Sequence, residues 1–86
     1  MLMLPDNKMP KVEHTVTPGR YRHYKGDEVE VLGTAFHSET MEEFVIYKHV
    51  TGKRQGEPYW WVRPAAMFVE EVEVEGKRVP RFEFIA

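Results

Sequence analysis

The sequence predicts an all-β protein: a small SH3-like antiparallel barrel of about five to six short strands, with at most one short helical turn. Three observations predict it. From Gly19 onward, apolar and polar residues alternate with a period of two, which is typical of half-buried strands, and helical periodicity is absent. The alternating runs are short and evenly spaced, which favours a closed or half-closed barrel because closure removes exposed sheet edges. The chain has only 86 residues, but its two Trp, four Tyr and five Phe are enough to fill a thin core.

The N-terminal residues differ from the rest of the chain. Pro5, Pro10 and Pro18 punctuate them, and no period emerges. We expect residues 1–17 to form an N-terminal arm that is loosely ordered or lies across the barrel. Residues 18–86 would then form a single small β-barrel domain, since a chain of this length holds one core.

The first two expected strands follow the arm. Residues 19–26 begin and end at glycine, and residues 28–31 (EVEV) place two valines on one side of a strand. Gly33 interrupts the second run, and a glycine inside a strand commonly marks a bulge. A bulge would turn Phe36 inward and His37 outward, whereas an unbroken strand would leave His37 on the core side.

The middle of the chain predicts two further strands. Residues 44–49 are apolar on both faces, so we expect a central strand that is covered on both sides. Residues 50–58 contain two glycines and a proline and predict a long hairpin loop. Residues 59–63 follow as a strand that Pro64 ends, and residues 65–67 (AAM) predict one helical or 3₁₀ turn.

The last two expected strands form a hairpin. Residues 72–74 and 79–85 would pair through Glu75-Gly76, a two-residue turn. Glutamate stands where Asp-Gly or Asn-Gly is typical, a difference that should cost little stability.

Composition argues against several classes of function. With 12 Lys and Arg against 14 Asp and Glu, the formal net charge is −2, which disfavours bulk, sequence-independent binding of nucleic acid. The absence of cysteine excludes disulfides, thiolate zinc sites and cysteine nucleophiles, and it fits a reducing cytoplasm. No apolar run approaches the ~20 residues of a membrane span, and the apolar residues 1–4 are too few for a signal peptide. We therefore expect a cytoplasmic protein without membrane contact.

Residues 19–26 (GRYRHYKG) carry the densest chemistry of the chain. Alternation would place Tyr21 and His23 on one face, with the arginines and Tyr24 on the other. An aromatic surface beside cations suits an anion, a nucleotide base or a carboxylate. Alternatively, the tyrosines complete the core and the arginines pair with Asp27, Glu28 or Glu30, which is the more common role of such side chains.

Residues 37–40 (HSET) suggest a hydrolase, because a histidine stands beside a hydroxyl and Glu39. Consecutive strand side chains diverge, however, so they rarely meet at one reacting atom. The alternative is a polar turn in which Ser38 and Thr40 cap backbone amides.

A metal site is a weaker hypothesis. The four histidines are scattered, without the close spacing of a ligand pair. His23 and His37 would meet if their strands were neighbours, and Glu39 or Glu42 would then join them.

Two adjacent tryptophans, at positions 60 and 61, must face opposite sides of a strand, so one of them belongs to the core. Trp61 and Arg63 are two residues apart, so their side chains face the same side of the strand. An exposed Trp61 beside Arg63 would form a stacking surface, although an arginine over an indole is equally common as plain packing.

Four ordered blocks resemble a known family: residues 18–26 (PGRYRHYKG), 31–40 (VLGTAFHSET), 61–68 (WVRPAAMF) and 76–82 (GKRVPRF). The chain resembles the short bacterial proteins of domain-of-unknown-function family 1653, from about Pro18 to Ile85. The resemblance implies a compact, mostly β, cytoplasmic bacterial domain, and it implies no activity. Carried over to this sequence, the family signature falls on Tyr21, Arg22, His23, Tyr24, Gly26, His37, Ser38, Glu39, Thr40, Trp61, Arg63, Pro64, Met67 and Phe68.

We expect a non-enzymatic binding module that recognises an anionic or aromatic ligand or a partner protein. Its candidate binding residues, round one end of the barrel, are His23, Tyr24, His37, Glu39, Trp61 and Arg63. Arg63 would hold an anionic group, Trp61 would stack, and His37 would supply hydrogen bonds together with Glu39. The alternative is a domain that binds single-stranded nucleic acid or RNA, and a small hydrolase or metal-dependent enzyme is the third hypothesis. We expect no cofactor, no metal and no catalytic residue, and a monomer or weak homodimer.

Overall fold

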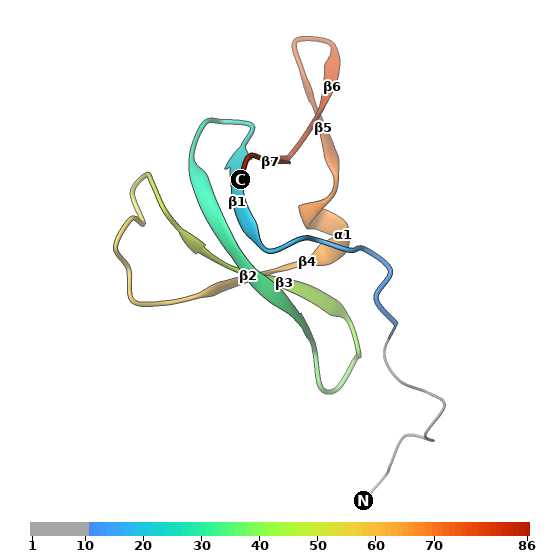
Figure 1. The fold of residues 1–86 in the computed structure, drawn as a ribbon. Helices are drawn as coiled ribbons and strands as arrows, with labels where there is room; N and C mark the ends of the chain where they lie inside the picture. The colour runs from blue at the N-terminus through green and yellow to red at the C-terminus, as the bar shows by residue number, and fades with distance from the viewer. Residues whose placement is uncertain (1–10) are drawn as a thin grey trace, which may run out of the picture.

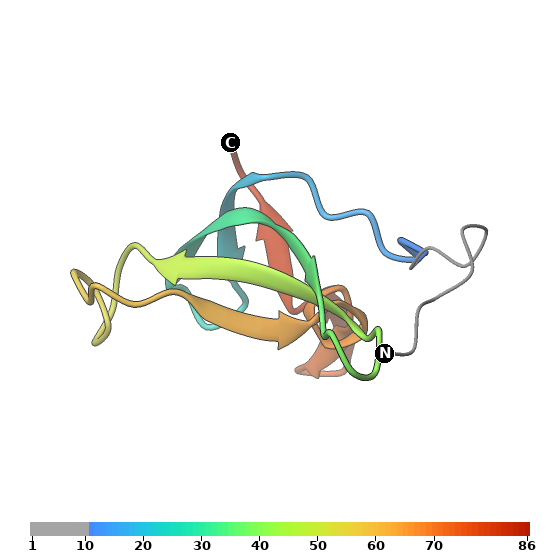
Figure 2. The same cartoon turned by 90° about the horizontal axis from the view of Figure 1, so that it is seen from below.

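The computed structural model describes residues 11–86, and its body is a five-stranded antiparallel sheet (Figure 1, Figure 2). In order across the sheet, its strands are β4 (Trp61–Pro64), β3 (Glu43–His49), β2 (Glu28–Phe36), β1 (Gly19–His23) and β7 (Phe82–Phe84). A second, two-stranded sheet consists of β5 (Glu71–Val74) and β6 (Lys77–Pro80), and it projects from the body in Figure 1. One helical turn, α1 (Ala65–Phe68), follows β4 directly. The all-β class and the single helical turn are therefore confirmed.

The main sheet is open, so of the closed or half-closed barrel that the sequence predicts, the closed form is not found. Its edge strands β4 and β7 are not hydrogen-bonded to each other. Instead, α1 places Phe68 against Phe82 of β7, with the two rings stacked and their centroids 4.2 Å apart. Both edge strands are short, at four and three residues. Side-chain packing of α1 therefore takes the place of the backbone hydrogen bonds that would have closed the barrel.

The core lies on the inner face of this sheet. Alternation along β2 buries Val29 and Val31, and alternation along β3 buries Val45 and Tyr47. Apolar side chains of the arm and of α1 complete the buried cluster, which consists of Val16, Tyr21, Val29, Val31, Val45, Tyr47, Ala65, Phe68 and Phe82. The predicted inward valines of residues 28–31 are thus confirmed.

The predicted bulge at Gly33 is present. Val31 pairs with Tyr47, but the next pair in the register is Gly33 with Ile46, so β2 carries one extra residue. The shift moves Phe36 to a partly buried position and leaves His37 exposed. His37 therefore faces away from the core, as the bulge predicts.

β3 is central, between β2 and β4, and only one of its faces is fully buried. On the other face Phe44 and Ile46 stay half-buried, so the expected cover on both sides is incomplete. β4 begins at Trp61 instead of residue 59, and Trp60 is 68% exposed in the preceding loop. The indole N–H of Trp61 donates to Glu57 at 3.2 Å, which ties the incoming loop back just before the strand begins.

The predicted hairpin through Glu75-Gly76 is present between β5 and β6. Both turn residues have positive φ, 52° and 79°, as a two-residue type I′ turn requires. The expected strand at 79–85, however, is split in two. Arg81 lies between β6 and β7, where its N–H donates to Glu70 O and its carbonyl accepts from Tyr24 N–H. The chain therefore passes from the small sheet to the main sheet at Arg81.

Residues 11–17 of the expected arm contact the sheet. Val16 is 7% exposed, and Thr17 O accepts a hydrogen bond from the Tyr21 hydroxyl at 2.8 Å. Both the backbone N–H and the ring Nδ1 of His14 lie 3.2 Å from Glu43 Oε1. The prediction for residues 1–10 lies outside the described residues. Within residues 11–86, no helix has the length and apolar character needed to cross a bilayer.

Candidate functional site

A cavity of about 200 Å³ opens at one end of the inner face, and we call it the strand-end cavity. All five strands of the main sheet contribute to its lining, because alternation points every second residue inward: β3 contributes two residues and each other strand one. The β1–β2 turn adds two charged residues. The lining residues are His23, Lys25, Asp27, Val29, Tyr47, His49, Arg63 and Phe82.

Arg63 is the principal cation of this cavity. It pairs with Val45 in the β3–β4 register, which places its side chain on the inner, apolar face. The guanidinium carbon Cζ lies 5.5 Å from the centroid of the Phe82 ring. Within residues 11–86 its Nε is buried without a hydrogen-bond partner, and no carboxylate forms an ion pair with it. The positive charge of Arg63 is therefore not neutralised by a direct partner in this part of the chain.

His23 is held beside Arg63 in a defined protonation state. Its Nδ1 accepts a hydrogen bond from the Lys25 backbone N–H at 3.1 Å, so the neutral ring carries its proton on Nε2. Burial lowers the pKa of His23 below its usual 6.5, and the nearby cations Arg63, Arg81 and Lys25 lower it further, while Asp27 opposes them. The imidazole is therefore neutral at pH 7, with an N–H to donate.

The charges around the cavity sum to an excess of positive charge. Lys25 and Arg63 line it, and Asp27 is the one carboxylate among its lining residues. Arg81 lies close enough to affect His23, but it is paired with Glu70 at 2.9 Å. A small anion would therefore find a net attractive field and, at Arg63, a donor without an acceptor among residues 11–86.

The predicted stacking surface of Trp61 beside Arg63 is not found. Both residues lie on the inner face, as their parity predicts, but Trp61 is half-buried against the core. The guanidinium over its ring belongs to Arg54 of the preceding loop, 4.4 Å from the centroid. His49 packs edge-on against Trp61 at 5.6 Å. Trp61 is therefore a support behind the cavity, and it does not offer an open stacking face beside Arg63.

His37 and Glu39 lie far from the strand-end cavity, in the β2–β3 turn. His23 is next to the β1–β2 turn, whereas His37 follows the far end of β2, whose nine residues span roughly 30 Å at about 3.3 Å each. The ring of His37 is 6.3 Å from Phe44, whose side chain is on the opposite face from Val45. The structure thus brings His23 and Arg63 together and does not bring His37 and Glu39 to them.

Residues 37–42 form the polar turn that was the alternative to a hydrolase site. His37 Nδ1 accepts the backbone N–H groups of Glu39 and Thr40 at 3.1 and 3.2 Å. Thr40 Oγ1 accepts the N–H of Glu42 at 3.2 Å. Capping by Thr40 is therefore confirmed, and the second capping acceptor is His37 where Ser38 was expected. No group of three or more His, Asp or Glu among residues 11–86 is arranged to hold a metal ion.

Tyr24, another candidate binding residue, lies outside the cavity and is 39% exposed. Its ring packs on His23 at 4.5 Å. The arginines of β1 belong to the outer face as well, where Arg20 and Arg22 both form ion pairs with Glu28, at 3.8 and 3.5 Å. The expected alternative, pairing of these arginines with nearby acidic residues, is confirmed for Glu28.

Several lining residues were not among the predicted site residues. His49 shares its parity with Tyr47 on an expected strand, so alternation alone was enough to place it on the inner face. Asp27 flanks the first turn and approaches the β3–β4 loop: a Cβ at Gly52 would lie 2.8 Å from Asp27 Oδ2. This close approach is between segments far apart in the sequence, and no local sequence pattern predicts it.

Comparison with known proteins gives two matches and one absence. The family described as "Protein of unknown function (DUF1653)" matches residues 19–84. The crystal structure of a protein of that family from Bordetella bronchiseptica is 37% identical and superimposes with a TM-score of 0.71, covering 81% of this chain and 87% of that chain. No curated protein matches the sequence. Since the family match extends over most of the chain, and the family structure shares its fold, this protein belongs to the DUF1653 family.

Proposed function

We propose that the protein is a non-enzymatic binding module whose strand-end cavity holds a small anionic group, a carboxylate or a phosphate. The observation that carries the proposal is Arg63: a guanidinium on the inner face, over Phe82, without an ion-pair partner among residues 11–86. A guanidinium in such a partly desolvated setting forms short, charge-assisted hydrogen bonds to carboxylate or phosphate oxygens.

The size of the cavity supports a small ligand group. At about 200 Å³ it is smaller than the ~300–1,000 Å³ typical of sites for drug-sized ligands and cofactors. The apolar walls of Val29, Tyr47 and Phe82 would contact the carbon skeleton next to the anionic group. We therefore infer either a small free anion with an apolar or aromatic body, or the anionic end group of a protein partner.

The test is an amide chemical-shift titration with acetate, benzoate, inorganic phosphate and a short peptide that ends in a free carboxylate. We expect saturable shifts at His23, His49 and Arg63. The variant Arg63→Gln should bind at least about tenfold more weakly, because a hydrogen bond to a charged group contributes about 1.5–3 kcal/mol. The matched control is Arg78→Gln, which removes the same charge from the exposed β5–β6 hairpin. Equal affinities of the two variants would contradict the proposal.

The alternative, binding of single-stranded nucleic acid, rests on a different observation. Tyr59 and Trp60 are 66% and 68% exposed in the loop before β4, where bases would stack on them. A short oligonucleotide added to the same titration separates the two functions. Nucleic-acid binding would place its shifts on residues 53–60 and would weaken steeply with salt.

Three finer expectations belong to the same proposal. An SH3-like architecture is supported by the five antiparallel strands bent round one core, with the gap between β4 and β7 as its departure from a closed barrel. A bacterial origin is supported by the family member from Bordetella bronchiseptica, and a cytoplasmic location by the absence of cysteine. Fractionation of cells that express the tagged protein tests the location.

A further inference from the structure

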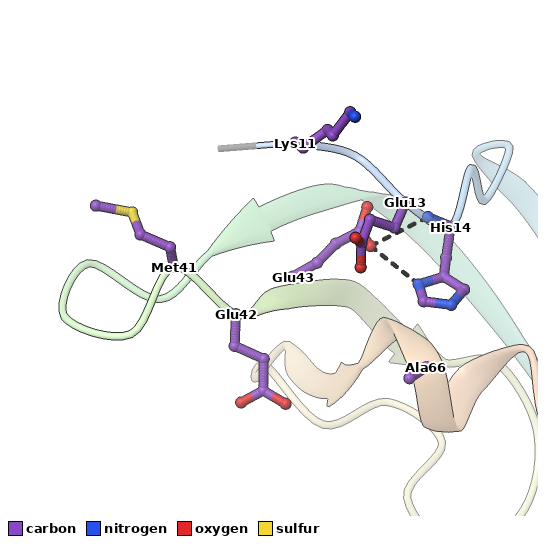
Figure 3. A pocket seen from close by; sticks show the side chains of 7 residues that line it. All are labelled: Lys11, Glu13, His14, Met41, Glu42, Glu43 and Ala66. Carbon is purple, nitrogen blue, oxygen red and sulfur yellow. Dashed lines mark hydrogen bonds and ion pairs between the residues drawn. The ribbon is translucent and has the colours of Figure 1, made fainter. Parts of the chain in front are cut away.

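A second cavity, of about 320 Å³, lies at the other end of β3, and we call it the arm pocket (Figure 3). Three segments distant in the sequence form it: residues 11–14 of the arm, the end of the β2–β3 turn and the start of α1. It shares no lining residue with the strand-end cavity. The lining residues are Lys11, Glu13, His14, Met41, Glu42, Glu43 and Ala66.

Glu43 is the unusual residue of this pocket. Its side chain is only 9% exposed, although it carries a carboxylate. Oε1 accepts from the backbone N–H of His14 and lies 3.2 Å from its ring Nδ1. Oε2 is buried, and no group in residues 11–86 donates a hydrogen bond to it. A buried carboxylate oxygen without a donor is costly, so this atom marks a place where a donor would bind favourably.

The remaining charges of the pocket favour a cation. Figure 3 shows the side chains of Glu13 and Glu43 directed toward each other. The ammonium of Lys11 points away from Glu43, and the carboxylate of Glu42 points to the other side. The described lining residues carry three carboxylates, on Glu13, Glu42 and Glu43, against one ammonium, on Lys11, which favours a positively charged guest.

We propose that the arm pocket binds an organic cation that carries N–H groups, a primary ammonium or a guanidinium. Its N–H would donate to Glu43 Oε2, and Glu13 would supply the second carboxylate. Glu13 is exposed, so its side chain is free to change rotamer when a guest enters the pocket. Met41 and Ala66 provide apolar contact for the alkyl chain of the guest. A metal ion is a poorer match, because residues 11–86 contain no cluster of three or more His, Asp or Glu suited to one.

The experiment is an amide chemical-shift titration of the full chain with methylguanidinium, putrescine and a short peptide containing one arginine. Tetramethylammonium is the matched probe, because it has the same charge and no N–H. We expect saturable shifts at His14, Glu43 and Ala66 with the N–H cations only. Preference for the peptide over putrescine would identify a protein partner as the source of the cation, and the reverse preference would identify a free polyamine.

The variant Glu43→Gln should weaken binding at least about tenfold, since it removes the charge that the hydrogen bond relies on. The matched control is Glu39→Gln, which removes the same charge from the exposed β2–β3 turn. If Glu43→Gln does not fold, Glu13→Gln tests the second carboxylate, with a several-fold loss expected. Equal binding by Glu43→Gln and Glu39→Gln, equal shifts with tetramethylammonium, or no saturable shift with any probe would each overturn the proposal.

Discussion

Phe68 is the residue on which the open sheet most depends, and its removal should cost about 3–5 kcal/mol of folding free energy, the usual range for truncating a buried aromatic side chain to alanine. It is 1% exposed, it stacks on Phe82 at 4.2 Å, and it meets the Tyr21 ring edge-on at 5.4 Å. Phe68→Ala therefore removes these two aromatic contacts and a third, with the Tyr47 ring at 6.1 Å, and leaves a cavity at the seam between β4 and β7.

That loss is large for this protein. At ~0.05–0.15 kcal/mol per residue, a chain of this length is stabilised by roughly 4–13 kcal/mol, so the variant should be near the limit of folding. The matched control is Phe84→Ala. Phe84 also meets Tyr21 edge-on, at 5.3 Å, but it is 50% exposed, so we expect a loss of about 1 kcal/mol.

The assay is urea unfolding followed by Trp fluorescence, with the midpoint and the slope fitted separately. If Phe68→Ala does not fold, Phe68→Leu keeps most of the volume and should lose about 1.5 kcal/mol. A loss below about 1 kcal/mol for Phe68→Ala, or a loss equal to that of Phe84→Ala, would refute the claim that α1 holds the two edges together.

Two further predictions concern single residues. The pKa of His23 is lowered in the folded protein, chiefly by burial and then by nearby cations, so the unfolded chain binds the proton more readily. The contribution of His23 to the free energy of unfolding should therefore be fully present above pH 6.5 and should fall as the pH drops below that value. Urea midpoints at pH 7.5 and 5.5 check this, and His23→Gln should reduce the difference. Glu75 has a φ of 52°, which asparagine adopts more readily, so Glu75→Asn should raise the free energy of unfolding by up to about 1 kcal/mol. An unchanged or lower thermal midpoint would show that the turn carries no such strain.

Alternation in the sequence predicts faces well, because the period of two is a property of every strand. It places Val29 and Val31 inward, it places Tyr21 and His23 on one face and Trp61 and Arg63 on one face, and with the bulge at Gly33 it turns His37 outward. Alternation does not predict where along a strand, or at which end of the sheet, a residue lies. His37 and Glu39 were therefore grouped with His23, although the length of β2 separates them.

Contacts made by irregular segments also cannot be predicted from the sequence pattern. Arg54 reaches the ring of Trp61 from a loop without periodicity, and it occupies the place that parity suggested for Arg63. The sequence also does not reveal that the sheet stays open, for a related reason. Phe68 of α1 stacks on Phe82 between the two edge strands, a contact between residues 14 positions apart that no strand period indicates. The arm pocket likewise depends on His14 meeting Glu43, 29 residues away.

The seam between β4 and β7 gives the strand-end cavity a property that a closed barrel lacks. In a closed barrel the strand number and stagger fix the diameter, so a wider interior requires broken backbone hydrogen bonds. Here Arg63 belongs to one edge of the sheet and Phe82 to the other; no strand ladder joins these edges, and one backbone hydrogen bond, from Arg81 N–H to Glu70 O, lies beside the seam. Widening this seam would break side-chain contacts and leave every strand ladder intact. A ligand bulkier than the cavity would therefore meet side chains at the seam, where a closed barrel would present a continuous ladder of backbone hydrogen bonds.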